Sequence, residues 1–158
     1  MSGWSDTAQL PADDEHQRFA RYLQELADVR QKEEAELVRS VLRDPDTVMA
    51  QSAVVRHLDR RAAQLLNDPG FADWFHAMSM AIGEQEFLVH RLQEWTLLRV
   101  IAVNAPWRPE DLLAASDWFQ RTAVQILTSP AALRLLASEG RTRRVRTAAD
   151  RWLTEQRR

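Results

Sequence analysis

Apolar residues recur along this chain at intervals of three and four positions, and no run of residues alternates strictly between apolar and polar. Intervals of three and four place side chains on one face of an α-helix, whereas strict alternation is typical of a strand. The pattern therefore predicts an all-α protein. We expect about seven helices, which cover residues 13–43, 46–67, 70–82, 84–103, 110–128, 131–138 and 142–156.

Prolines and glycines mark where these helices begin and end. A capping side chain stands directly before a proline at 44–45, 68–69 and 129–130, and proline is tolerated at the first helical position. Gly83 and Gly140 stand where helices are expected to end, because glycine readily adopts the backbone conformation that closes a helix. These boundaries agree with the intervals of the apolar pattern.

The lengths of the predicted helices and connections limit the architecture. The first helix carries a wholly polar stretch at residues 30–34, where we expect it to bend or break. Connections shorter than about six residues are usual between antiparallel neighbours, and the mixture of long and short helices argues against a regular four-helix bundle. We expect a flexible segment over residues 1–12 and a single all-helical domain over residues 13–158, folded as an orthogonal array or as a HEAT-like stack of helical hairpins.

The C-terminal region contains an acidic turn followed by a Val-Arg pair, small residues and a leucine. This stretch of about 15 residues resembles the second helix of a HEAT-type repeat. The resemblance implies stacked helical hairpins whose usual work is to bind other macromolecules. The residues that carry it are Glu139, Val145, Arg146, Ala148, Ala149 and Leu153.

Composition narrows the class of protein. The chain has 158 residues, of which 45% are hydrophobic and 28% charged, as expected of one globular domain. It has no cysteine, which excludes disulfides, iron–sulfur clusters and thiol catalysis. The longest apolar stretch, at residues 95–103, is interrupted by Arg99 and is far shorter than the roughly 20 residues of a membrane span. No secretory signal opens the sequence, so we expect a cytoplasmic protein without a membrane partner, and the strong use of arginine over lysine indicates a bacterium with GC-rich DNA.

Patterns for catalysis and metal binding are missing from the sequence. Glu86, His90 and Glu94 are spaced by four along one predicted helix, but di-iron bundles use a Glu-x-x-His spacing on two helices. Ser79 and Ser116 fall inside predicted helices, without the glycine-flanked turn that exposes the nucleophile of a serine hydrolase. We therefore predict no metal, no cofactor and no small-molecule substrate. A non-enzymatic protein is favoured, and an enzyme of an unrecognised kind stays open.

Charge is distributed unevenly along a chain whose formal charge is −2. Residues 1–50 carry 11 acidic and 6 basic side chains, whereas residues 134–158 carry 3 acidic and 8 basic ones. In the last predicted helix, Arg143, Arg144 and Arg146 stand near the N-terminus. A helix N-terminus carries a positive partial charge, so a cation in the first turn costs about 0.3–1 kcal/mol at low salt.

These arginines indicate that an anion lies nearby. The anion is a phosphate, an acidic partner protein or an acidic region of this same chain. The acidic residues that we consider for the last case are Asp13, Asp14, Glu15, Glu33, Glu34 and Glu36.

Tryptophan is abundant, and four of the six residues fall at or beside helical apolar stripes, which predicts that they belong to the core. Trp107 differs from these four, because it stands in a predicted loop next to Arg108. A Trp-Arg pair in a loop either contacts a partner or covers the core between the flanking helices. Trp4 precedes the first predicted helix and is either disordered or a short anchoring motif.

Together the observations favour a cytoplasmic adaptor or regulatory subunit that docks an acidic protein surface, on another protein or on a second copy of the chain. The alternative is a nucleic-acid-binding protein that uses the helix-turn-helix-like unit at 131–156, although a dedicated nucleic-acid binder is normally basic. The predicted partner-binding residues are Arg143, Arg144, Arg146 and Arg151, with Trp107 and Arg108 as a second patch.

Overall fold

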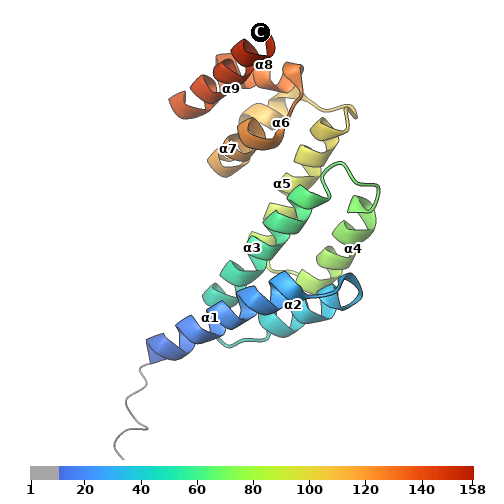
Figure 1. The fold of residues 1–158 in the computed structure, drawn as a ribbon, viewed down its shortest axis with the longest axis vertical. Helices are drawn as coiled ribbons and strands as arrows, with labels where there is room; N and C mark the ends of the chain where they lie inside the picture. Colours follow the sequence, from blue (N-terminus) through green and yellow to red (C-terminus); the bar gives the residue numbers. More distant parts are fainter. Residues whose placement is uncertain (1–10) are drawn as a thin grey trace, which may run out of the picture. The chain divides into compact units, whose positions relative to one another are not determined.

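The computed structural model describes residues 11–158 of the chain (Figure 1). This range contains nine α-helices, one short 3-10 helix and no β-strand, so the prediction of an all-α fold is confirmed for the described residues. Residues 1–10, with Trp4 and most of the predicted flexible segment, lie outside the described residues. The elements are α1 (Pro11–Asp28), η1 (Gln31–Glu33), α2 (Glu34–Leu42), α3 (Thr47–Gln64), α4 (Phe71–Ile82), α5 (Glu86–Ala102), α6 (Pro109–Ala114), α7 (Asp117–Ile126), α8 (Pro130–Glu139) and α9 (Arg143–Gln156).

Two of the predicted helices are divided in the structure. The first becomes α1, η1 and α2, and the interruption falls at the polar stretch that predicts it. The helix predicted at 110–128 becomes α6 and α7, because Ala115 and Ser116 adopt extended backbone conformations between them. The Ser116 hydroxyl accepts a hydrogen bond from the backbone N–H of Phe119 at 3.1 Å. The prediction that Ser116 lies inside a helix is therefore wrong, since this residue is the N-cap of α7.

The helices group into two compact units. Unit 1 comprises Met1–Ala62 and Ala72–Leu92, and unit 2 comprises Ala63–Phe71 and Gln93–Arg158. The single domain over residues 13–158 stays a prediction, and so does the choice between an orthogonal array and a HEAT-like stack. Within residues 11–158, no helix combines the length and the apolar character needed to cross a membrane.

Unit 1 has an apolar core with one buried polar cluster. The Glu34 carboxylate, 2% exposed, lies at the start of α2 and accepts hydrogen bonds from three side chains. His57 Nε2 lies 2.6 Å from it, Arg61 Nε 3.0 Å and Trp74 Nε1 2.9 Å. Arg60 donates to His57 Nδ1 at 2.9 Å. His57 therefore lies between the Glu34 carboxylate and the Arg60 guanidinium.

The ionisation of Glu34 follows from this cluster. Burial by itself raises the pKa of the Glu34 carboxyl group, because the charged form loses its hydration. The hydrogen bonds from His57, Arg61 and Trp74 outweigh burial and bring the pKa to about 2. Glu34 is therefore ionised at neutral pH and connects α2 with α3 and α4.

Unit 2 is built on two aromatic residues and a helical hairpin. Trp95 on α5 and Trp118 on α7 meet edge to face, with ring centroids 5.7 Å apart and an interplanar angle of 70°. The helices α8 and α9 pack in an antiparallel manner, since Pro130 at the start of α8 and Gln156 at the end of α9 line the same surface hollow. The buried side chains of unit 2 include Leu98, Ile101, Leu112, Phe119, Ala123, Leu127, Leu133, Leu136, Val145 and Ala149.

Candidate functional site

The turn between α8 and α9 sets where α9 begins. The backbone N–H of Gly140 donates to the Leu136 carbonyl at 2.9 Å, which closes α8. A Cβ atom at position 140 would lie 2.6 Å from that same carbonyl oxygen and 2.9 Å from Val145 Cγ1, so only glycine fits here without a shift. The Thr142 hydroxyl then accepts from the backbone N–H of Val145 at 3.2 Å and caps α9.

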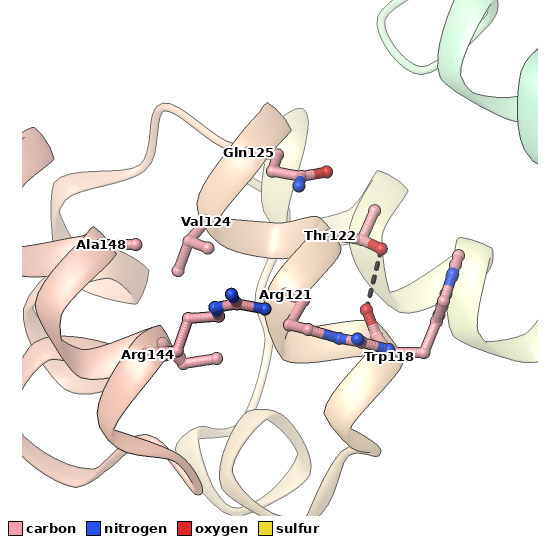
Figure 2. A pocket seen from close by; sticks show the side chains of 8 residues that line it. Trp118, Arg121, Thr122, Val124, Gln125, Arg144 and Ala148 are labelled. Carbon is pink, nitrogen blue, oxygen red and sulfur yellow. Dashed lines mark hydrogen bonds between the residues drawn. The ribbon is translucent and has the colours of Figure 1, made fainter.

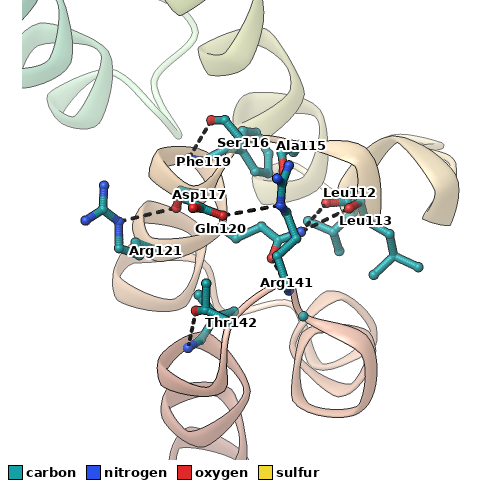
Figure 3. Close-up of polar contacts among 12 residues, drawn as sticks. Leu112, Leu113, Ala115, Ser116, Asp117, Phe119, Gln120, Arg121, Arg141 and Thr142 are labelled. Atoms are coloured by element: carbon teal, nitrogen blue, oxygen red, sulfur yellow. Dashed lines mark hydrogen bonds and ion pairs between the residues drawn. The ribbon is translucent and has the colours of Figure 1, made fainter.

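A fully buried glutamine fixes this turn to α6 and α7 (Figure 3). Gln120 Nε2 donates to the carbonyl oxygens of Leu112 at 3.0 Å and Leu113 at 3.3 Å. Its Oε1 accepts from the backbone N–H of Arg141 at 2.8 Å. The Arg141 guanidinium donates to the Ala115 carbonyl and pairs with Asp117 at 3.2 Å. Every polar atom of the Gln120 side chain is used, and the start of α9 is held in place.

The arginines of α9 serve different ends. Arg146 is half-buried and donates from Nη1 to the Gly140 carbonyl at 2.7 Å, so its charge contributes to the structure of the turn. Arg143, Arg144 and Arg151 are exposed, and they form no ion pair or hydrogen bond with the described residues. The first turn of α9 contains no acidic residue. Of the four arginines predicted on this helix, three are left available to a partner.

An open groove lies between α7 and α9, and we call it the α7–α9 groove. Its volume is about 430 Å³. Val124, Val145 and Ala148 supply apolar surface, and Figure 2 shows the Arg144 side chain reaching from α9 toward α7. Thr122 donates its hydroxyl proton to the Trp118 carbonyl at 2.8 Å, so this hydroxyl is already satisfied. The lining residues are Trp118, Arg121, Thr122, Val124, Gln125, Arg144, Val145 and Ala148.

The outer side of α9 forms a second hollow, of about 480 Å³, which we call the α9 face. Arg144 and Ala148 line both hollows, so the two form one continuous surface. Four arginines and no carboxylate line this surface. The residues of the α9 face are Arg143, Arg144, Thr147, Ala148 and Arg151.

Sequence reasoning missed the contribution of α7 to this surface. The apolar pattern predicts Trp118 in the core, yet this residue is half-buried and lines the α7–α9 groove, and the pattern does not single out Arg121. Arg121 is exposed, and its Nε donates to the Asp117 carbonyl at 3.4 Å. The packing of α7 against α9 is what makes these residues part of the surface, and no pattern within either helix predicts that packing.

The second predicted patch lies elsewhere. Trp107 is half-buried in the loop before α6, and Arg108 is the residue that precedes the first turn of α6. The Arg108 guanidinium pairs with Glu110 at 3.4 Å, and both side chains are largely exposed. Neither Trp107 nor Arg108 lines the α7–α9 groove or the α9 face. The structure therefore does not bring the two predicted patches together.

Two of the acidic residues considered as internal partners, Glu34 and Glu36, have other contacts in the structure. Glu34 is buried and occupied by His57 and Arg61. Glu36 pairs with Arg39 and Arg43, each at 3.4 Å. The side chain of Asp13 lies outside the described part. These contacts lie within unit 1, and an acidic region of this same chain stays one of the three predicted anions.

Metal-binding clusters are not found in the described part of the chain. Within residues 11–158, no three histidine, aspartate or glutamate side chains are placed to hold one ion. Of the helical trio considered above, Glu94 accepts a hydrogen bond from the hydroxyl of Ser116.

The chain matches no protein-family model, no curated protein and no solved structure.

Proposed function

We propose that this protein is a non-enzymatic adaptor or regulatory subunit that docks an acidic protein surface on its α7–α9 groove and α9 face. The observation that carries the proposal is the set of four exposed arginines around an apolar floor, without any carboxylate in the lining. Unit 2 as a whole carries 11 basic and 8 acidic side chains, a net charge of +3 in a chain of net charge −2. The α8–α9 hairpin, with its resemblance to HEAT-type repeats, is compatible with a binding role.

At the N-terminus of α9, contact with a carboxylate of the partner is more favourable than contact with bulk solvent. Arg143 and Arg144 occupy the first two positions of α9, where each cation costs about 0.3–1 kcal/mol at low salt. A carboxylate placed there is attracted both by the guanidinium groups and by the positive end of the helix. An exposed ion pair contributes only about 0.2–1 kcal/mol, so the affinity must also come from apolar contact. Trp118 and the arginines are residue types that often dominate binding energy at interfaces.

Nucleic-acid binding is the second candidate, favoured by the arginines at the N-terminus of the second helix of the α8–α9 unit. Two observations weigh against it. A DNA-reading helix-turn-helix crosses its helices at roughly 90–120°, whereas α8 and α9 lie antiparallel. Arg146, which such a helix would direct at phosphate, is occupied by the Gly140 carbonyl. An acidic protein surface is therefore the better partner.

A polarisation titration separates the two candidates. The probes are a flexible peptide rich in glutamate and leucine, a single-stranded oligonucleotide of mixed sequence and a duplex of mixed sequence. Each is titrated at about 50 mM and at about 150 mM salt, because the Debye screening length is longer than about 10 Å at the lower concentration and shorter at the higher one. We expect the peptide to bind, and the Arg143→Glu/Arg144→Glu variant to weaken it by about tenfold, or about 1.4 kcal/mol. The matched control is Arg157→Glu/Arg158→Glu, which makes the same charge change on exposed residues at the end of the chain, outside both hollows.

Three results decide the matter. Loss of peptide binding in the Arg143→Glu/Arg144→Glu variant but not in the control supports docking at this surface. Tighter binding of the oligonucleotides, lost in the same variant and falling steeply with salt, supports the nucleic-acid candidate. Failure of the peptide to bind at about 50 mM salt, where exposed charges are least screened, overturns the proposal.

A further inference from the structure

The arginines of the α9 face are arranged with a regular spacing. Arg144 and Arg151 are seven residues apart on one continuous helix, so they are separated by about 10.5 Å along its axis. Seven residues at 3.6 per turn return almost to the same angular position, so both guanidinium groups belong to one side of α9. Neither side chain has a hydrogen bond or ion pair within the described residues.

The residues between these arginines are small. Thr147 and Ala148 stand three and four positions after Arg144 and line the same hollow. Helices that pack closely have axes about 8–10 Å apart, and the side chains at the contact set that distance. A threonine and an alanine at the middle of the face, with an arginine at each end, leave room for an approaching helix.

A helix is also the form of partner that this part of the protein can receive. An extended peptide gains its affinity by adding a strand to a sheet edge, and residues 11–158 contain no strand. A groove between two helices binds the apolar face of an amphipathic helix, which is recognised by residues three, four and seven positions apart. The α7–α9 groove has apolar residues from both of its helices, Val124 and Val145 among them, beside the arginine row.

We infer that the acidic partner is an amphipathic α-helix that lies along α9 and presents two carboxylates seven residues apart to Arg144 and Arg151. The inference rests on the proposed function and specifies the partner of that same surface. An apolar residue three or four positions after the first carboxylate then lies over Ala148 and the α7–α9 groove. Arg121, on the α7 side of that groove, meets a further acidic residue on the flank of the helix.

The test compares two fluorescein-labelled, alanine-rich helical peptides of identical composition. In the first, two glutamates stand seven residues apart with a leucine between them, so that both share one face. In the second, the glutamates stand five residues apart and point about 140° away from each other. We expect the first peptide to bind about tenfold more tightly than the second, a difference of about 1.4 kcal/mol.

Variants locate the discrimination between the peptides. Arg151→Gln should reduce the ratio of the two dissociation constants to about two or less, because only one carboxylate then finds a cation; this corresponds to about 0.4 kcal/mol. Arg157→Gln removes a neighbouring exposed arginine that is absent from the α9 face, and it should leave the ratio unchanged. Circular dichroism of each variant confirms that α9 remains folded.

The outcomes separate this inference from the proposed function. If wild type binds both helical peptides equally and loses both in the Arg143→Glu/Arg144→Glu variant, the seven-residue spacing is wrong and acidic docking stands. If only the flexible acidic peptide binds, the helical form of the partner is wrong and acidic docking again stands. If no acidic probe binds, both proposals are overturned.

Discussion

Replacing Gln120 by methionine tests whether one buried side chain holds the start of α9. Methionine keeps the length and nearly the volume of glutamine but removes its amide, so the three hydrogen bonds to Leu112, Leu113 and Arg141 are lost. Each such bond contributes about 0.5–1.5 kcal/mol net, and an acceptor or donor left buried without a partner costs more. The Leu112 carbonyl keeps a second partner, the backbone N–H of Ala115 at 3.4 Å. We therefore expect a loss of about 2–3 kcal/mol in the free energy of unfolding.

Urea denaturation followed by tryptophan fluorescence measures this loss. The Trp95–Trp118 pair lies in the same unit as Gln120 and reports on its unfolding. With a denaturant slope of about 2 kcal/mol per molar, the midpoint should fall by about 1–1.5 M urea. Gln125→Met is the matched control, since Gln125 is an exposed residue of the same helix, and its midpoint should move by less than about 0.25 M. A Gln120→Met midpoint that stays within the range of the control would refute the view that Gln120 fixes the turn.

Three further predictions concern charge and packing. The pKa of Glu34 lies at about 2, below the ordinary 4.5, so the ionised carboxylate contributes about 3 kcal/mol to stability above pH 4.5 and loses this contribution as the pH falls toward 2. The difference in unfolding free energy between wild type and Glu34→Gln should therefore narrow over that pH interval, and a constant difference contradicts the prediction. Gly140→Ala should lower the stability by about 1–3 kcal/mol in urea denaturation, because the added Cβ meets the Leu136 carbonyl at 2.6 Å, and an unchanged midpoint would show that the turn relaxes freely. Arg146→Ala should lower the Tm, because the variant loses a hydrogen bond from a charged donor, which is worth about 1.5–3 kcal/mol. Arg144→Ala should leave the Tm unchanged or slightly higher, and a lower Tm for this variant would show that Arg144 supports the fold.

The all-α fold and the interruption of the first helix could be predicted from the sequence, because both depend on residues that are close together along the chain. The period of the apolar residues reports the helix directly, and the polar stretch at 30–34 leaves nothing for a continuous stripe to bury. The break before α7 also had a local signal, the Ser116-Asp117 pair, which is typical of a helix N-terminus. The apolar residues on either side continue at helical intervals, so the apolar pattern alone predicts one uninterrupted helix here.

The candidate site could be predicted only in part, because it depends on tertiary packing. The pattern within α9 identified Arg143, Arg144 and Arg151 but could not separate them from Arg146, whose guanidinium is turned back onto the Gly140 carbonyl. That separation requires knowledge of where the turn before α9 lies. The contribution of Arg121 is likewise invisible in one dimension, since it depends on α7 packing beside α9.

The arginines in the first turn of α9 are unfavourable for helix stability, and the contacts in the structure explain only some of them. Arg146 of α9 holds the turn before the helix through the Gly140 carbonyl, and Arg141, which lies in that turn, contacts the Ala115 carbonyl and Asp117. Arg143 and Arg144 give the described fold no such contact, although they stand where a cation costs about 0.3–1 kcal/mol each. A residue that lowers stability and makes no stabilising contact is best explained by a role in function, because residues that are locally unfavourable for the fold concentrate at functional sites. This argument ties the proposed docking to these two arginines more strongly than to the number of basic residues on the helix.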